Sequence, residues 1–222
     1  AAGQGSRFGG DIPKQFAPLC GKAILFHSIE TFESMSEFSR IWLVLPAEFI
    51  SDFDKRFNLS GFSKIAGWVA GRERRQDSVW VGLSNLPSDT TIVAIHDAAR
   101  PCVTPSDVFR AVSVAERMGA AILAAPATDT VKRTNADGRI VETLDRHSLW
   151  LAQTPQVFRF DLIRRAYAKV FDDGIEVTDD AVAVEHIGEP VEVIPSQWPN
   201  PKITTADDLH YVEWLLGREN RR

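Results

Sequence analysis

A glycine-rich loop with two cations opens this chain and constrains its fold more than any other stretch. The sequence begins AAGQGSRFGGDIPKQ, in which Arg7 and Lys14 are the cations. Because glycine has no Cβ, the backbone N–H groups of such a loop can lie directly against a ligand. Amide donors beside fixed positive charges are suited to bind a polyphosphate. The loop therefore predicts a polyphosphate site, and a flexible terminal tail is the alternative interpretation.

The glycine spacing differs from two common phosphate-binding motifs. No Gly-Lys-Ser/Thr follows the glycines as in a P-loop, and Phe8 stands where the dinucleotide fingerprint needs its third glycine. Loops of this kind normally follow a buried strand, yet the sequence starts at Ala1. We therefore expect that a short apolar strand, central to the sheet, precedes the loop in the parent protein.

The composition narrows the class of protein. A chain of 222 residues is long enough for one sizeable core, so one domain spanning residues 1–222 is expected. The net charge of −5 argues against nucleic-acid binding, so local cations would hold any anionic ligand. No apolar run reaches the roughly 18 residues that a membrane span needs, so no membrane partner is expected. Cys20 and Cys102 lack metal-ligand spacing and fit a reducing cytoplasm.

Strand-like and helix-like segments alternate along most of the chain. Strands are expected at 41–45, 65–70, 91–96, 120–125 and 191–194, and helices at 24–32, 49–57, 75–86, 104–118, 159–169, 178–186 and 205–217. This alternation predicts an α/β fold with a mostly parallel, three-layer sheet. Asp-Gly between two polar, β-prone arms predicts a hairpin at about 131–146 that projects from the sheet, onto a partner subunit.

Polar groups fall at the expected strand ends, where ligands of open α/β sheets bind. These groups are the glycine loop and residues 71–78, 97–100 and 128–130, and we expect them to converge on one rim. Asp97 suits coordination of Mg²⁺ that bridges phosphate oxygens, and capping of nearby amides is the alternative. His96 is expected to be a bonded core histidine. Arg100 would either bind an anion or pair with Asp97.

Several other polar residues have two readings each. Of the arginines at 72, 74 and 75, only one need face the site, and Ser78 would bond either a base or a backbone amide. Lys202 is either a surface charge or a third cation near the loop. Arg146 and Thr154 could hold the phosphate of a second substrate. Residues 178–180 could serve only as a helix N-cap, and no Ser/His/Asp or Cys/His set predicts acyl chemistry.

Taken together, these residues resemble the nucleotidyltransferases that join the cytidylyl group of CTP to a sugar or polyol phosphate. The resemblance is closest to the 2-C-methyl-D-erythritol 4-phosphate cytidylyltransferase family and runs nearly end to end. It rests on motifs at 1–7, 13–15, 75–79, 96–101, 125–132, 145–146, 153–156, 178–180 and 202–204. It implies a Rossmann-like nucleotidyltransferase fold, a homodimer built by interlocking hairpin arms, Mg²⁺ dependence and a cytoplasmic location.

The resemblance also implies a reaction and a role for each site residue. The family transfers the cytidylyl group of CTP to 2-C-methyl-D-erythritol 4-phosphate, and 4-diphosphocytidyl-2-C-methyl-D-erythritol and pyrophosphate are the products, in non-mevalonate isoprenoid biosynthesis. The implied catalytic residues are Arg7, Lys14 and Lys202. The implied nucleotide-binding residues are Ala2, Gly3, Gly5, Gly71, Arg75, Ser78 and Ala98. The implied acceptor-binding residues are Asp97, Arg100, Thr130, Arg146, Thr154 and Thr178, with Asp97 also the metal ligand.

Two departures and two rival functions accompany this resemblance. Arg72 replaces a glycine expected before the cytosine-reading segment, and Pro201 replaces an apolar residue before Lys202. Ribitol 5-phosphate cytidylyltransferases share the loop and much of the motif order, but the segments 96–100 and 143–146 favour the isoprenoid enzyme. A CTP-binding module without turnover is the second alternative. The acceptor phosphate is already ionised, so in-line attack on the α-phosphorus of CTP needs positioning and charge neutralisation rather than a general base.

Overall fold

The computed structural model describes residues 1–3 and 13–219. The predicted site residues Gly5 and Arg7 lie outside the described residues. The strands are β1 Pro18–Leu19, β2 Lys22–Ala23, β3 Ile41–Leu45, β4 Ile65–Ala70, β5 Ile92–Ile95, β6 Ala120–Pro126, β7 Lys132–Thr134, β8 Ile140–Thr143, β9 Trp150–Arg159 and β10 Glu192–Pro195. The helices are α1 Ile24–Ser34, α2 Phe53–Arg56, α3 Arg75–Ser84, α4 Pro105–Met118, α5 Phe160–Asp172, α6 Asp180–His186 and α7 Asp207–Glu219, with 3₁₀ turns at Lys14–Phe16, Ala47–Phe49 and Arg146–Ser148.

The main sheet has four strands in the order β10-β6-β9-β5. Strand β10 pairs parallel with β6, whereas β9 pairs antiparallel with both β6 and β5. Strands β5, β6 and β10 therefore share one direction, and β3 and β4 form a separate parallel pair. The predicted α/β fold is confirmed, and three of the four strands of the main sheet run in one direction, although β9 runs antiparallel to both of its neighbours. Strand β9, which runs through the middle of the sheet, was not predicted.

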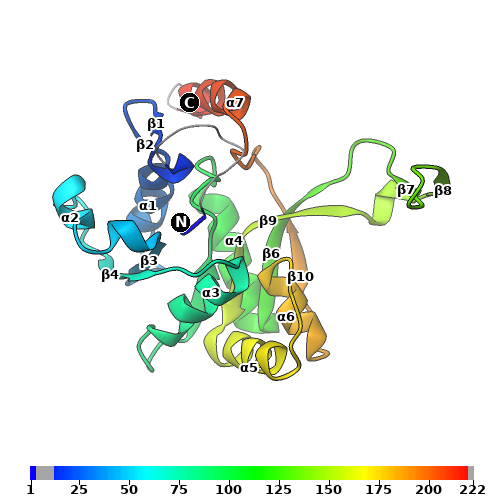
Figure 1. The fold of residues 1–222 in the computed structure, drawn as a ribbon, viewed down its shortest axis with the longest axis horizontal. Coiled ribbons are helices and arrows are strands. Elements are labelled where there is room, and N and C mark those ends of the chain that lie inside the picture. Colours follow the sequence, from blue (N-terminus) through cyan, green and yellow to red (C-terminus); the bar gives the residue numbers. More distant parts are fainter. Residues whose placement is uncertain (4–12, 220–222) are drawn as a thin grey trace.

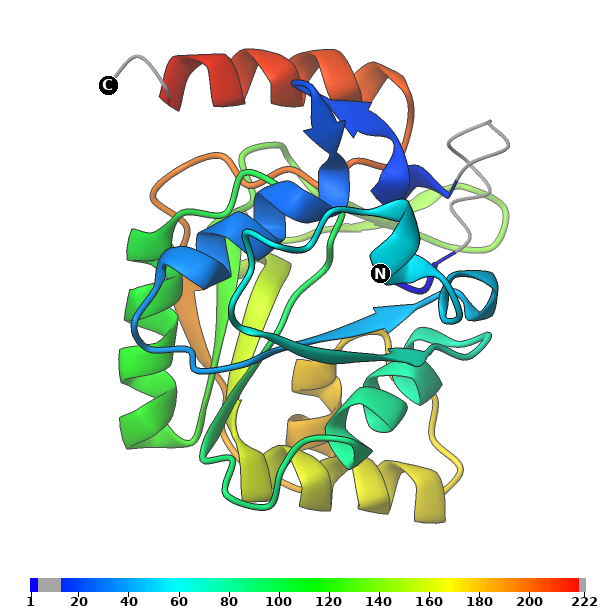
Figure 2. The same ribbon diagram turned by 90° about the vertical axis from the view of Figure 1, so that its left-hand side faces the viewer.

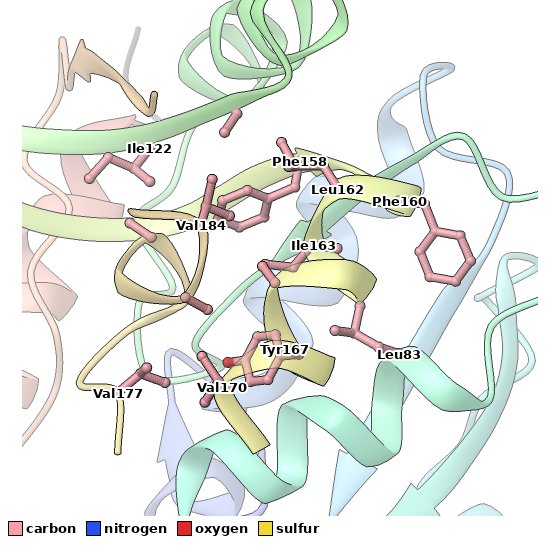
Figure 3. Close-up of a cluster of buried hydrophobic side chains, with 14 residues drawn as sticks. Leu83, Ile122, Phe158, Phe160, Leu162, Ile163, Tyr167, Val170, Val177 and Val184 are labelled. Atoms are coloured by element: carbon pink, nitrogen blue, oxygen red, sulfur yellow. The ribbon is translucent and has the colours of Figure 1, made fainter. Parts of the chain in front are cut away.

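Helices cover both faces of the main sheet, because alternate residues of β6 and β9 point to opposite sides. On one face, α1 and α4 pack on β6 and β9 through Phe32, Val108, Ala111, Val112, Ala115, Ala121, Leu123 and Val157. On the other face, α3, α5 and α6 pack through Leu83, Ala120, Ile122, Phe158, Ile163, Tyr167 and Val184, most of them shown in Figure 3. These are the three layers that the sequence predicts. Helix α7 lies across one end, over β1 and β2 (Figure 2).

Local sequence signals account for several helix boundaries. Thr104 Oγ1 accepts a hydrogen bond from Asp107 N and so caps α4, with Pro105 at the first helical position. The expected helix at 49–57 is wrong as one element, because a 3₁₀ turn ends at Phe49 and α2 starts only at Phe53. The phenylalanines of this segment stack around Phe16, so tertiary packing decides their placement.

The hairpin arm projects well away from the body of the molecule (Figure 1). Strands β7 and β8 pair antiparallel, and Gly138 in the turn has a φ of 78°. Asn135 Oδ1 accepts from Asp137 N and Arg139 N, which closes the turn. Ile140 and Val141 are 64% and 59% exposed although both are apolar. The arm thus carries apolar surface that this chain does not cover.

Strands β3 and β5 both line a pocket of about 700 Å³. Within the described residues β3 pairs only with β4, and β5 pairs only with β9, so one edge of each strand has no partner. Leu25 and Ile29 of α1 and Val79 of α3 also line the pocket, and Ala1 is among the lining residues. The apolar strand expected before Ala1 stays a prediction, and a slot between two open strand edges is compatible with it. None of the helices in the described part of the chain is both long and apolar enough to cross a membrane.

Candidate active site

Asp97 lies two residues beyond the end of β5 and stands between two cations. Lys202 Nζ lies 2.6 Å from Asp97 Oδ2, and Arg75 Nε lies 3.6 Å from Oδ1. Burial alone would raise the pKa of Asp97, but the charges of Lys202 and Arg75 outweigh it and hold the pKa well below its usual range. Asp97 is therefore an ionised carboxylate at neutral pH, and it lines the pocket together with both cations.

Segments from both ends of the chain meet at this carboxylate. Lys14 Nζ donates to the carbonyl oxygen of Ile203 at 2.9 Å, across 189 residues of sequence. Ile203 N in turn donates to Ala99 O at 2.8 Å, which ties the Lys202 segment to the segment after β5. Lys14 and Lys202 both line the pocket. The predicted cations from the first loop and from the C-terminal segment thus lie at one rim.

The turn after β4 brings Gly71 against the first residues of the chain. A Cβ on Gly71 would lie 2.1 Å from the Cβ of Ala2 and 3.0 Å from Ser78 Oγ, so only glycine fits there. Ser78 Oγ accepts from Arg72 N at 2.8 Å and donates to Arg72 O at 3.0 Å. The hydroxyl of Ser78 therefore bonds the backbone in this structure. It also holds the turn at Arg72.

Of the three neighbouring arginines, Arg75 is the one that pairs with Asp97. Arg74, just before α3, pairs with Asp77 in its first turn, at 2.7 Å. Arg75 places both Nη atoms on the carboxylate of Asp180, at 3.0 and 2.6 Å. Burial would lower the pKa of Arg75, but Asp180 and Asp97 raise it, so this guanidinium stays charged. The interaction with Asp180 was not predicted.

His96 is a neutral, internally bonded residue. Its Nε2 faces the carbonyl oxygen of Arg100 at 3.2 Å, and its Nδ1 faces Thr154 Oγ1 at 3.1 Å. Because a carbonyl oxygen only accepts, we infer that Nε2 carries the proton and that Nδ1 accepts from the hydroxyl of Thr154. Burial lowers the pKa of His96 to about 4. These contacts match the expected core histidine and leave neither nitrogen free to act as a base.

A bulge in β9 turns Thr154 toward Asp97. Ile122 pairs with Gln156 and Ala124 pairs with Ala152, so residues 153–155 of β9 lie opposite a single residue of β6. Thr154 Oγ1 accepts from Asp97 N at 3.0 Å. The bulge thus couples the middle of β9 to the backbone of the site.

Other predicted acceptor-binding residues are divided between this region, the base of the arm and the turn before α6. Arg100 donates to Asn200 O at 2.8 Å, and Asn200 Nδ2 donates to Thr154 O at 2.9 Å, a role for Asn200 that was not predicted. Three other residues are exposed and are not among the described residues that line the pocket; they are Thr130, Arg146 and Thr178. The predicted nucleotide-binding residues Ala2, Gly3, Gly71 and Ala98 lie near the rim, all but Gly71 as lining residues.

Asp97 offers a single carboxylate as a possible Mg²⁺ ligand. No group of three or more His, Cys, Asp or Glu side chains within residues 1–3 and 13–219 could hold a metal. Mg²⁺ is commonly bound by one or two carboxylates, with substrate phosphates and water as the other ligands. The single ionised carboxylate of Asp97 therefore fits an ion that arrives with a triphosphate, rather than an ion held by protein ligands alone.

Comparison with known proteins adds three findings. The family model described as 2-C-methyl-D-erythritol 4-phosphate cytidylyltransferase matches residues 1–218. A relative of that name from Desulforamulus reducens is 40% identical over 223 residues, which cover 99% of this chain and 94% of the relative. The structure resembles the crystal structure of 4-diphosphocytidyl-2C-methyl-D-erythritol synthase from Anaerococcus prevotii, with a TM-score of 0.85, 28% identity, and coverage of 98% of this chain and 95% of that one.

A second solved structure agrees with the first. The chain resembles 2-C-methyl-D-erythritol 4-phosphate cytidylyltransferase from Francisella tularensis, with a TM-score of 0.79 and 33% identity, over 94% of this chain and 96% of that chain. The similarity therefore extends over nearly the whole of both chains, in sequence and in fold.

Proposed function

This chain belongs to the 2-C-methyl-D-erythritol 4-phosphate cytidylyltransferase family, and we infer from that membership what it does. It is a cytidylyltransferase that joins the cytidylyl group of CTP to 2-C-methyl-D-erythritol 4-phosphate, with release of pyrophosphate, in non-mevalonate isoprenoid biosynthesis. The observation that carries this function is the meeting of Lys202 and Arg75 at one ionised carboxylate, with Lys14 bonded to the residue after Lys202 at the same rim. A triphosphate and its attacking phosphate need such a concentration of positive charge.

We propose the following roles in the transfer. A phosphate oxygen of the acceptor attacks the α-phosphorus of CTP, the bond to the bridging oxygen of the β-phosphate breaks, and pyrophosphate leaves. Lys14, Lys202 and Arg7 neutralise the charge that develops on the phosphates, and the loop residues Ala2, Gly3 and Gly5 hold the triphosphate. Asp97 would hold Mg²⁺, which when bound supplies further neutralisation of phosphate charge. Arg75, Gly71, Ser78 and Ala98 would bind the nucleotide at the rim.

We also propose where the acceptor phosphate binds. Arg100 and Thr154 of one subunit would lie on one side of it. The other side would be formed by Thr130, Arg146 and Thr178, some of them from a second copy of the chain. Thr130 and Arg146 are exposed at the base of the arm, where Arg146 Nη1 donates to Thr128 O at 2.9 Å. Exposed apolar side chains on a projecting hairpin are typical of an interface between proteins. The arm is therefore the proposed contact of a homodimer.

A charged arm should separate the proposed dimer. In a variant with Ile140→Asp and Val141→Asp, we expect the mass in solution to halve, since two buried charges would face the partner. Analytical ultracentrifugation gives the mass, and the KM for the acceptor should rise in the same variant. Met118 on α4 is 52% exposed, so Met118→Asp is a matched control that should keep the dimer. A wild-type monomer, or a variant that stays dimeric, would refute the arm contact.

Pyrophosphate release tests the reaction and its acceptor together. With CTP and Mg²⁺, we expect release only when 2-C-methyl-D-erythritol 4-phosphate is added. Release only with ribitol 5-phosphate would keep the mechanism and change the acceptor. Measurable CTP binding without release, with either acceptor, would favour the binding module.

A cytoplasmic location is part of the proposal. Cys20 and Cys102 are both free thiols, and Cys20 is exposed. Free thiols are typical of a reducing compartment.

A further inference from the structure

A closed ring of contacts links Asp97 to the N-terminus of α6. Asp97 N donates to Thr154 Oγ1, and two residues further along β9 Gln156 Oε1 accepts from Asp180 N at 2.9 Å. The carboxylate of Asp180 holds both Nη atoms of Arg75. Arg75 Nε lies 3.6 Å from Asp97 Oδ1, and this ion pair closes the ring. Asp97 is thus connected to Asp180 through its backbone on one side and through its carboxylate on the other.

Asp180 is anchored far more firmly than a surface cap requires. Its side chain is 0% exposed, and Tyr167 Oη donates to its Oδ1 at 2.6 Å. Tyr167 itself is fully buried in the cluster of α5 and α6 (Figure 3). Gln156 Nε2 donates to Asp179 Oδ2 at 2.9 Å, which fixes the turn before α6. A buried carboxylate is unfavourable unless it is well paired, and the side-chain contacts of this one go to Arg75 and Tyr167.

The two cations that contact Asp97, Arg75 and Lys202, differ in how firmly they are held. Two parallel N–H···O contacts to Asp180 fix both the position and the plane of the Arg75 guanidinium. Lys202 is a flexible point charge whose side chain is 40% exposed and contacts Asp97 through Nζ. A triphosphate bound at the rim beside Asp97 would compete with Asp97 for Lys202, whereas Arg75 is held in place by Asp180. Asp97 would then keep its contact with Arg75 when Lys202 moves to the phosphates.

We propose that Asp180 and Tyr167 are positioning residues, which hold Arg75 against Asp97 while Lys202 moves from Asp97 to the phosphates of the substrate. The inference rests on the proposed function. It gives the Thr178–Asp180 segment a purpose beyond capping α6, although Asp179 Oδ1 does accept from Val182 N as an N-cap. It also makes the arrangement of the site depend on the packing of α5 and α6, on the far face of the sheet.

Two variants test this positioning role. In Asp180→Asn we expect kcat to fall about 10²-fold, as for other small displacements of groups in a site. Tyr167→Phe removes only one hydrogen bond, so it should stay folded and lose about threefold to tenfold in kcat. Asp107→Asn is the matched control, because Asp107 is equally buried and pairs with Arg110 at 2.6 Å, on the α4 side of the sheet. The control should lose stability with kcat unchanged.

A double-mutant cycle separates positioning from general stability. If Asp180 matters because Lys202 leaves Asp97, then Asp180→Asn should cost less in a Lys202→Ala background than in the wild type. Additive losses, or full kcat in folded Tyr167→Phe and Asp180→Asn proteins, would overturn the inference. All variants are compared with the acceptor that the wild-type protein uses. The double-mutant cycle therefore remains valid even if that acceptor is not 2-C-methyl-D-erythritol 4-phosphate. A wild type with no turnover on any acceptor would overturn the proposed function, and the inference with it.

Discussion

Replacement of Lys202 by alanine is expected to lower kcat by about 10²-fold or more in a protein that stays folded. An oriented charge at a developing negative charge typically contributes this much to the rate. Lys202 is half-exposed and its side chain forms an ion pair with Asp97, so its removal opens no cavity in the core. Lys14→Ala should give a similar loss, since Lys14 lies at the same rim and bonds Ile203 O. Steady-state kinetics with saturating CTP give kcat, and circular dichroism checks the fold.

Another ion pair of the chain provides the control for this prediction. Lys169 Nζ lies 2.6 Å from Asp173 Oδ1, the same separation as in the pair of Lys202 with Asp97, but on α5 away from the pocket. Lys169→Ala should leave kcat unchanged. Near-normal turnover in well-folded Lys14→Ala and Lys202→Ala proteins would remove both lysines from the catalytic role.

The elements with strong local signals could be predicted from the sequence. Helix α4 carries its cap, its first-turn proline and its apolar face within a few residues of sequence, and its predicted range of 104–118 is nearly that observed. The turn at Gly138 likewise needs only its Asp-Gly pair and the flanking β-prone residues. Such signals act over distances shorter than one helix, so neighbouring residues suffice to read them.

Strand β9 could not be predicted from its own sequence. Its sequence contains Pro155 and polar residues, and proline normally argues against a central strand. The strand tolerates Pro155 because residues 153–155 form the bulge opposite β6. The side chain of Gln156 is satisfied by backbone N–H groups of α6, which lie 24 and 25 residues away. Only the folded context makes this segment a strand.

The same limit applies to the site. Two parts of the rim, residues 71–78 and 97–100, could be predicted because each follows a strand, and ligands of such sheets bind at strand ends. Residues 128–130 also follow a strand but do not line the pocket, so this part of the expected convergence is not observed. The partnership of Arg75 with Asp180 spans 105 residues, and a Thr-Asp-Asp segment reads equally well as a helix cap. The sequence pattern indicates that Tyr167 is a core residue, and it is buried. The sequence does not indicate that its hydroxyl binds Asp180.

Replacement of Asp97 by asparagine should have the second large effect. Asparagine keeps the size of the side chain but removes the charge that faces Lys202 and Arg75. We expect kcat to fall about 10²-fold, and the Mg²⁺ concentration for half-maximal rate to rise tenfold or more, because loss of even an indirect metal partner often costs that much affinity. Titration of the initial rate with Mg²⁺ measures both quantities.

The control and the pH dependence make this prediction specific to the metal. Asp173 also pairs with a lysine, Lys169, and hydrogen bonds from Lys169 and His186 lower its pKa. Asp173→Asn therefore removes a similar charge outside the pocket and should change neither quantity. Because burial is outweighed by the neighbouring cations, the pKa of Asp97 lies well below its usual range, and lowering the pH to 5 should not mimic the variant. A fall in kcat with unchanged Mg²⁺ dependence would mean that Asp97 acts by placing Lys202 and Arg75, not by holding the metal.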